Sequence, residues 1–344
     1  RYNPKPLDSE QLRAKIDDVR MLLEKAVQTD KAMPEAYYNL GRFFIYNNKQ
    51  DGAIENLTEA IKLFETAAPM NARRTVRYVD AMRLLGEQLV DQKKYLEAQT
   101  LYVDALTVYR DYTAFKPLPP NKDIGKLYAD YGDIDYFISY NFDSALESYQ
   151  NAVKQLYNTP SINYRIGYIH YQQENYRQAI EAMSRAYAEK AHDKNLLYGF
   201  GNALFKRGDY FAAFAAYEEL LGLLNAQRAR KEQVLLNTRP DDAAFIERYM
   251  HTANNLGATL NRLSERTGDS QKNGRALALY AEATRAWDAL TRNPQTMIRA
   301  KSVGLAYLNT QNMLNARSSY QSEIYTDIPM ILENERALEQ KENK

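Results

Sequence analysis

The chain contains no cysteine, and this absence excludes disulfide bonds, thiol catalysis and thiolate metal sites. It leaves the compartment open, because a reducing cytosol and an oxidising periplasm both tolerate a cysteine-free helical protein. The sequence also begins at Arg1 rather than at a methionine. We therefore expect a fragment or a processed product of a longer precursor.

Recognisable catalytic and cofactor motifs are missing as well. The three histidines, His170, His192 and His251, are far apart and form no two-histidine helical metal motif. The segment Gly199-Phe200-Gly201 begins like a dinucleotide fingerprint, but a third glycine and a preceding strand are lacking. No phosphate loop and no nucleophile elbow occur. We predict a chain that is not an enzyme and has no catalytic residue, metal site or cofactor.

The chain also has few glycines and prolines and a net charge close to zero. Only 14 glycines and 11 prolines occur in 344 residues, which favours an all-helical chain. Forty-five basic and 44 acidic residues leave a net charge of +1, so no global charge draws the chain to nucleic acid or to an anionic membrane. No apolar run approaches the roughly 18 residues of a membrane helix, so no membrane span is expected.

The sequence does contain a repeat of 34 residues. Three segments, which begin near Lys126, Pro160 and Lys194, align without a gap. The middle segment has a glycine, two alanines and a large apolar residue in a pattern that recurs one period later. The corresponding residues are Gly167, Ala179, Met183 and Ala186 in the middle segment, Gly201, Ala213, Tyr217 and Leu220 in the last, and Gly132, Ala145, Tyr149 and Ala152 in the first.

This pattern has a physical cause. Ala179, Met183 and Ala186 are spaced i, i+4, i+7, which places them on one face of a helix. Gly201 lies inside a helix, where glycine costs up to about 1 kcal/mol relative to alanine. The simplest compensation is a close approach of the paired helix at Ala213. We expect Gly201→Leu to overpack this contact by about 1–3 kcal/mol.

A period of 34 residues with these positions resembles the tetratricopeptide repeat, a helix-turn-helix unit that stacks into a solenoid. The resemblance extends from about Met33 to Tyr325 and implies an all-α superhelix of about seven repeats, three in register and four with longer connections. Two overlong helices on either side of Pro240 are expected to project as a helical hairpin. A set of tyrosines matches the packing positions of the family, namely Tyr102, Tyr149, Tyr176, Tyr210, Tyr217, Tyr280 and Tyr320.

The expected organisation follows from these repeats and from the prolines between them. The segment at 115–120 is rich in proline and cannot be helical, so it is the expected place for the array to bend or divide. The expected parts are a lead-in and capping helix at 1–32, repeats one and two at 33–112, a spacer at 113–125, repeats three to five at 126–225, the extended hairpin at 226–249, repeats six and seven at 250–328, and a C-terminal capping helix and tail at 329–344.

The resemblance also implies where a partner would bind. In the family, the first helix of each repeat faces a concave groove through its second, fifth, ninth and twelfth positions. Tyrosine at such positions offers a large contact area and a hydroxyl at little entropy cost. We expect a peptide or helix of a partner protein to contact Ile134, Phe137, Tyr164, Tyr168, Tyr171, Tyr198, Asn202 and Phe205, with Tyr38 and Arg42 on one flank.

Two alternatives concern this groove. Extra helices of the chain itself could fill it, since the insertions are long. The family's capture of a C-terminal carboxylate by lysine and asparagine pairs is not expected, because Tyr198 and His251 stand where the lysines should be, although Asn202 and Asn255 match the asparagines.

We therefore predict a protein-protein interaction scaffold or adaptor within a larger assembly. The general appearance of the sequence resembles repeat proteins of bacterial cell-envelope machines. The most specific expectation is a spirochaetal flagellar collar subunit. This resemblance favours a periplasmic or cell-envelope location. Two other functions stay open. The chain could be the substrate-recognition module of an enzyme whose catalytic domain lies elsewhere, or a helical-repeat nucleic-acid binder, which the near-neutral charge disfavours.

Overall fold

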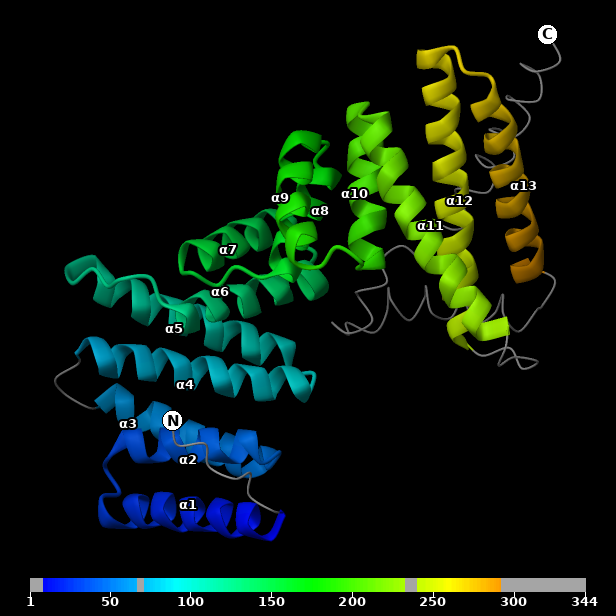
Figure 1. Cartoon of the computed structure of the whole chain (residues 1–344). Coiled ribbons are helices and arrows are strands. Elements are labelled where there is room, and N and C mark those ends of the chain that lie inside the picture. The colour runs from blue at the N-terminus through cyan, green and yellow to red at the C-terminus, as the bar shows by residue number, and fades with distance from the viewer. Residues whose placement is uncertain (1–8, 67–70, 233–239, 292–344) are drawn as a thin grey trace, which may run out of the picture. The chain divides into compact units, whose positions relative to one another are not determined.

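The computed structural model describes residues 9–66, 71–232 and 240–291, and in these residues it consists of helices joined by short connections (Figure 1). No strand occurs in these three ranges. The fold class predicted from the periodicity is confirmed. The helices are α1 (Ser9–Thr29), α2 (Pro34–Tyr46), α3 (Gln50–Thr66), α4 (Ala72–Asp91), α5 (Tyr95–Phe115), α6 (Lys122–Ile134), the π-helical turn η1 (Asp135–Ser139), α7 (Phe142–Lys154), α8 (Pro160–Gln172), α9 (Tyr176–Glu189), α10 (Lys194–Arg207), α11 (Tyr210–Glu232), α12 (Pro240–Thr267) and α13 (Gln271–Thr291).

Local chemistry explains where several helices begin. Asn71 caps α4 by accepting a hydrogen bond from the backbone N–H of Arg74 at 3.0 Å. Asp193 caps α10 in the same way, accepting from the N–H groups of Asn195 and Leu196. Pro160 occupies the first turn of α8, where a backbone N–H has no acceptor within the helix, so the N–H that proline lacks costs no hydrogen bond. Caps and prolines therefore divide the sequence into the predicted helices.

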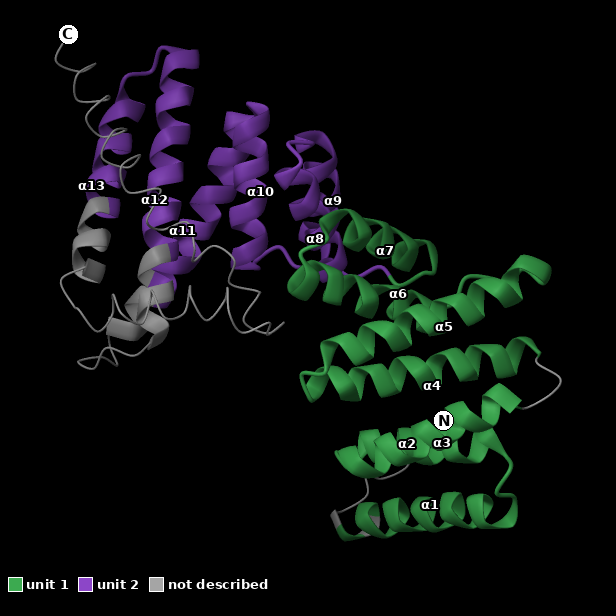
Figure 2. Cartoon of the chain, turned by 180° about the vertical axis from the view of Figure 1, so that it is seen from behind, with its two compact units in different colours: residues 1–157 green, residues 158–344 purple. Residues whose placement is uncertain are grey.

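The chain divides into two compact units, residues 1–157 and residues 158–344 (Figure 2). In unit 1, each helix from α1 to α6 contacts the next helix in the chain, and α7 contacts α6. In unit 2, the same holds from α8 to α13. The Pro-rich segment at 116–121 connects α5 to α6 within unit 1. Phe115, which was expected to lie outside a helix, is the last residue of α5. The boundary between the units follows Tyr157.

Six of the seven expected repeats are present as helix pairs in the described part of the chain. They are α2/α3, α4/α5, α6/α7, α8/α9, α10/α11 and α12/α13. The seventh repeat and the C-terminal cap lie outside the described residues, as does the tip of the expected hairpin at 233–239. The two helices of that hairpin, α11 and α12, have 23 and 28 residues, against 13 and 14 in α8 and α10.

The tyrosines at the packing positions form the centre of both units. Tyr102 and Tyr149 are buried in unit 1, and Tyr217 and Tyr280 are buried in unit 2, each with at most 1% of its surface exposed. Tyr176 and Tyr210 are half-buried. For these six residues the structural role expected from the repeat is confirmed, and Tyr320 lies outside the described residues.

The prediction that the three repeats align without a gap is wrong for the first of them, which contains one extra residue. Gly167 and Ala179 are 12 positions apart, whereas Gly132 and Ala145 are 13 positions apart. The π-helical turn η1 lies in this interval, and a π-turn is the usual way for a helix to accommodate one additional residue. When the repeats are aligned on their second helices, the residues of α6 are therefore displaced by one position from the equivalent residues of α8 and α10. A displacement of one position rotates a side chain by about 100° around the helix axis.

Candidate functional site

One helix of each pair also contacts the equivalent helix of the neighbouring pair. In unit 1, α4 contacts both α2 and α6, and in unit 2, α10 contacts both α8 and α12. These are the first helices of their repeats, which are the ones expected to line a groove. The side chains on this inner face differ in chemistry between the two units.

The inner face of unit 2 carries a set of half-buried aromatic residues. Tyr164 and Tyr168 lie on one face of α8, with ring centroids 6.4 Å apart. Tyr164 also packs over Gly199 of α10, where an added Cβ atom would lie 3.3 Å from its ring. We call the half-buried residues of this face the aromatic strip, and they are Tyr164, Tyr168, Tyr171, Tyr198, Asn202 and Phe205.

Hydrogen bonds hold the Asn202 end of the aromatic strip in place. The side-chain oxygen of Asn202 accepts from the hydroxyl of Tyr217 at 2.5 Å and from the amide of Asn255 at 3.0 Å. Asn255 also donates to the hydroxyl of Tyr198 at 3.3 Å. Burial raises the pKa of Tyr217 well above its ordinary value, so this hydroxyl stays protonated and acts as a donor. The network joins α10, α11 and α12.

The two positions that would hold lysines in a carboxylate-binding repeat carry rings instead. The rings of Tyr198 and His251 are 6.4 Å apart in an edge-to-face arrangement. The asparagines expected at the matching positions, Asn202 and Asn255, bond to each other. Aromatic contact and amide hydrogen bonding, rather than a pair of cations, therefore characterise this part of unit 2.

The inner face of unit 1 is charged. Tyr38 of α2 donates a hydrogen bond to Asp80 of α4 at 2.6 Å, and Asp80 pairs with Arg83 at 2.7 Å. Arg83 also pairs with Glu87 at 3.0 Å. We call the linked residues of this face the ionic network, and they are Asp80, Arg83, Glu87, Lys126 and Asp130.

Helix α6 completes the ionic network. Lys126 pairs with Glu87 and with Asp130, the latter at 3.1 Å, and Arg83 lies 3.5 Å from Asp130. Burial lowers the pKa of Arg83, but the three carboxylates around it more than reverse this, so the guanidinium stays charged. Burial raises the pKa of Asp130 to about 7, although Lys126 and Arg83 act in the opposite direction. Such a network orients α4 and α6, and through the bond from Tyr38 also α2, but offers few free groups to a ligand.

The structure buries three of the four predicted residues of unit 1. Ile134 and Phe137 are only 1% and 6% exposed, so both side chains belong to the core. The extra residue before α7 explains this, because it shifts the register of α6 by one position. Tyr38 is buried and bonded to Asp80, and the half-buried Arg42 lies over the Tyr38 ring at 5.4 Å.

The ion pairs of the ionic network were not predicted from the sequence. A signal was present, since Asp80, Arg83 and Glu87 alternate in sign at i, i+3 and i+7 on one helix face. Lys126 and Asp130 have the i, i+4 spacing of a helical ion pair. These spacings identify the two halves, but only the packing of α4 against α6 brings them together.

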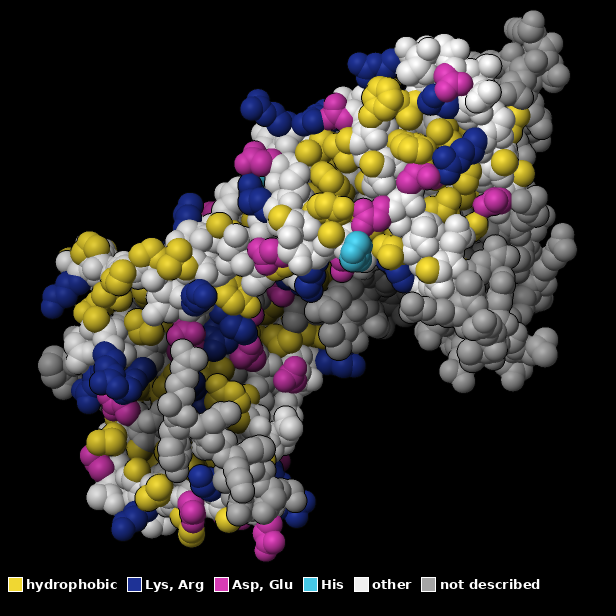
Figure 3. Space-filling model, viewed as in Figure 1, with side chains coloured by type: hydrophobic (Ala, Val, Ile, Leu, Met, Phe, Trp, Pro, Cys, Tyr) yellow, Lys and Arg dark blue, Asp and Glu magenta, His cyan; other side chains and the backbone are white. Residues whose placement is uncertain are grey.

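Three further properties limit the chemistry of the described residues. They contain no group of three or more His, Asp or Glu side chains arranged to hold a metal ion. None of their helices combines the length and the apolar character that crossing a membrane requires. On the face drawn in Figure 3, acidic and basic side chains are interspersed among apolar ones.

Two family models, both described as tetratricopeptide repeat, match the sequence. One matches residues 140–194 and 164–230, and the other matches residues 34–66. No significant match was found among curated protein sequences. The matched ranges include the helix pairs α2/α3 and α8/α9, and α10/α11 up to residue 230.

Solved structures with similar folds include three from bacteria. The C-terminal part of a TPR repeat-containing protein from Cytophaga hutchinsonii is 15% identical, with 83% of this chain and 94% of that chain covered and a TM-score of 0.47. BtubC from P. vanneervenii is 15% identical, with 68% and 96% covered and a TM-score of 0.47. PilF from Pseudomonas aeruginosa is 16% identical, with 71% and 95% covered and a TM-score of 0.41. Residues 34–66 and 140–230 match the tetratricopeptide repeat, the family that the 34-residue period first indicated.

Proposed function

We propose that this chain is a protein-binding scaffold whose aromatic strip in unit 2 binds a peptide or a helix of a partner protein. Tetratricopeptide repeats are interaction modules, and stacked helical repeats present extended binding surfaces. Beyond this general role, the proposal names the aromatic strip as the binding surface and a peptide or helix as the bound segment.

The observation that carries the proposal is the half-burial of the aromatic strip. The aromatic rings of the strip pack against the core of unit 2, and each of these residues keeps part of its surface exposed. A ring that is already fixed by its core contacts loses little conformational entropy when a partner covers it. The hydroxyls of Tyr164, Tyr168 and Tyr198 add hydrogen-bonding groups, which suits the amphipathic contact typical of protein interfaces.

Unit 1 has a different part in the proposal. Most charged groups of the ionic network already pair with one another, so we assign this face to the rigidity of α2, α4 and α6. Arg42 is half-buried beside this network and stays a proposed partner contact of unit 1. Ile134, Phe137 and Tyr38 are left out of the binding surface because they are buried.

The experiment that tests the proposal places a photo-crosslinking residue within the strip. Tyr168 is replaced by p-benzoylphenylalanine, the full chain is irradiated in a lysate of its source organism, and crosslinked products are identified by mass spectrometry. Phe211 is the matched control position, because it is an aromatic residue of unit 2 that is 60% exposed on α11, the second helix of its pair. We expect a defined partner to crosslink at position 168 and to be absent at position 211.

Three results would speak against this use of the strip. A crosslink to another segment of the same chain would show that the groove is filled internally. Identical products at positions 168 and 211 would indicate contact without a defined surface. Retention of the partner by a folded Tyr164→Ala, Tyr168→Ala, Tyr198→Ala variant would show that the strip does not contribute to affinity.

The proposed assembly is a large bacterial cell-envelope machine, with a flagellar collar as the most specific example. This step rests on the general resemblance of the sequence and on no single motif. Identification of the crosslinked partner tests it directly, since an envelope or flagellar component is expected. A cytoplasmic enzyme as the only partner would contradict it.

A further inference from the structure

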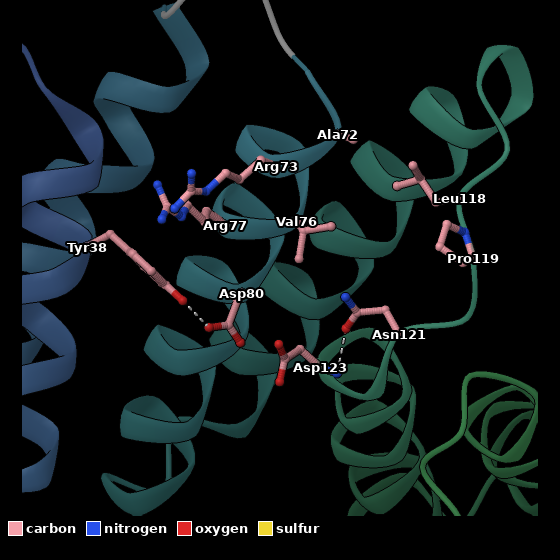
Figure 4. A pocket seen from close by; sticks show the side chains of 10 residues that line it. All are labelled: Tyr38, Ala72, Arg73, Val76, Arg77, Asp80, Leu118, Pro119, Asn121 and Asp123. Atoms are coloured by element: carbon pink, nitrogen blue, oxygen red, sulfur yellow. Dashed lines mark hydrogen bonds between the residues drawn. The ribbon is translucent and has the colours of Figure 1, made fainter.

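Unit 1 contains a pocket of about 440 Å³ between α2, α4 and the start of α6 (Figure 4). This volume lies in the range of sites that hold small ligands or a short stretch of peptide. The pocket has a basic, an apolar and an acidic part. Its lining comprises Tyr38, Ala72, Arg73, Val76, Arg77, Asp80, Leu118, Pro119, Asn121 and Asp123.

The pocket is built where unit 1 departs from the 34-residue repeat. Helix α4 has 20 residues, whereas α8 and α10 have 13 and 14, and its first turns supply Arg73, Val76 and Arg77. The Pro-rich connection between α5 and α6 supplies Leu118 and Pro119. Neither part exists in a repeat of standard length, so this pocket is not a feature of the repeats themselves.

Arg73 and Arg77 lie near the N-terminus of α4, the end of a helix at which positive charge is unfavourable. The N-terminus of a helix carries a partial positive charge, and the first turn of α4 holds no acidic residue. Neighbouring Arg74 is neutralised by Glu35 at 3.0 Å. No carboxylate of the described residues pairs with Arg73 or Arg77. Their i, i+4 spacing places two like charges on one helix face, which destabilises the helix unless an anion binds between them.

The basic part faces the side of the pocket where Tyr38 lies. Figure 4 shows the side chains of Arg73 and Arg77 extending from α4 in the direction of Tyr38. Arg73 is exposed and Arg77 is half-buried, so both guanidinium groups can be reached from solvent. Asp80, the nearest acidic group on α4, is already paired with Arg83 and bonded to Tyr38, and so does not neutralise them.

The rest of the lining distinguishes a peptide from a simple anion. Val76, Leu118 and Pro119 form an apolar wall, and Asp123 contributes an exposed carboxylate from α6. A peptide provides all the complementary groups at once, namely an acidic side chain, an apolar side chain and backbone N–H donors. A free inorganic anion would use only the two arginines.

We infer that this pocket binds a partner peptide through an acidic side chain next to an apolar one. The carboxylate lies between Arg73 and Arg77, whose planar guanidinium groups suit bidentate contact with a carboxylate. The apolar side chain lies against Val76, Leu118 and Pro119. This site is separate from the aromatic strip, and the inference does not depend on the proposed function of that strip.

A random octapeptide library, displayed and panned against the full chain, tests the inference for a ligand of any sequence. Asp or Glu beside an apolar residue should be enriched, and the enriched peptides should bind at least about tenfold more weakly to an Arg73→Gln, Arg77→Gln variant. Their affinity should fall with added salt, as for an exposed ion pair. Arg74→Gln is the matched control, since it removes the same charge from the same helix end outside the pocket.

Several results of this panning would overturn the inference. No acidic enrichment, or equal enrichment with the Arg73→Gln, Arg77→Gln variant, would remove the basis for a carboxylate site. An equal loss of affinity in Arg74→Gln would indicate a general charge effect. Displacement of the peptides by free glutamate or acetate at the same concentration as a full peptide would assign the site to small carboxylates. The Tyr164→Ala, Tyr168→Ala, Tyr198→Ala variant should bind these peptides normally, which separates this pocket from the aromatic strip.

Discussion

The phenol ring of Tyr217 covers the backbone of Gly201, so that a Cβ atom at position 201 would lie 2.6 Å from Cε1 of that ring. Tyr217 is 1% exposed, and its hydroxyl is bonded to Asn202, so the ring has no free space into which it could move. The close approach anticipated at Gly201 therefore exists, but the contacting residue is Tyr217 rather than Ala213. At Gly167 the equivalent approach involves Met183 and the carbonyl oxygen of Ala179.

Gly201→Leu should lower the free energy of unfolding by about 1–3 kcal/mol, because the added side chain overpacks the contact with Tyr217. Gly222→Leu is a matched control in the same unit, since position 222 is exposed on α11 and nothing lies within 4 Å of an added Cβ atom. This control should be stabilising by up to about 1 kcal/mol, because leucine favours a helix more than glycine does. Thermal melts of both variants decide the point, and equal effects at the two positions would contradict it.

Tyr38→Phe should destabilise unit 1 by about 1–3 kcal/mol, because it leaves a buried oxygen of Asp80 without its donor. Tyr37→Phe is the control, since the half-buried Tyr37 makes no hydrogen bond within the described residues. Its effect should stay within about 0.5 kcal/mol. Urea unfolding of the two variants provides the comparison. A loss in Tyr38→Phe no larger than in Tyr37→Phe would show that the hydroxyl is not required.

Asp130 should make stability fall as pH rises from about 5 to about 7. An unfolded aspartate titrates near pH 4, whereas burial raises the pKa of the folded Asp130 to about 7. Between these values the folded state holds the extra proton, so its stabilising contribution is fully present below the unfolded pKa and is lost as pH rises through the folded one. Relative to the wild type, Asp130→Asn should therefore gain about 1 kcal/mol of stability per pH unit in this window.

Urea unfolding at pH 5 and pH 7 measures this difference, with Asp111→Asn as an exposed control on α5 that should leave the slope unchanged. The groups that face Asp130 are Arg83 and Glu87 on α4 and Lys126 and Asp133 on α6. A slope of the opposite sign would show that the pairs with Lys126 and Arg83 outweigh the effect of burial.

Asn202 and Tyr217 should show coupled effects on stability. Asn202→Ala removes the acceptor of a buried hydroxyl and should cost about 1–3 kcal/mol. In a Tyr217→Phe background no hydroxyl is left unpaired, so the same substitution should cost less, with a coupling energy of about 0.5–3 kcal/mol. A double-mutant cycle by chemical denaturation measures this quantity. Strictly additive effects would mean that Tyr217 finds another acceptor when Asn202 is lost.

The periodicity of the sequence was sufficient to predict the helix pairs and their cores. Spacings such as those of Ala179, Met183 and Ala186 determine which face of a helix is apolar, because the geometry of a single helix is local. The half-buried positions of Tyr164, Tyr168 and Tyr198 were predictable for the same reason, once the repeat was in register. Whether a partner covers them stays a prediction.

Only the tertiary structure showed which residues of different repeats contact one another. Tyr38 and Asp80 are 42 positions apart, and no local spacing shows that their side chains meet. The π-turn at η1 shifted the register of α6 by one residue, which places Ile134 in the core and Lys126 in the ionic network. Phe137 lies in the π-turn itself and is buried there. The pocket beside Arg73 and Arg77 likewise depends on how two insertions pack. Each of these features is a contact between distant segments, and its geometry is set by the packing of whole helices rather than by the residues of any one of them.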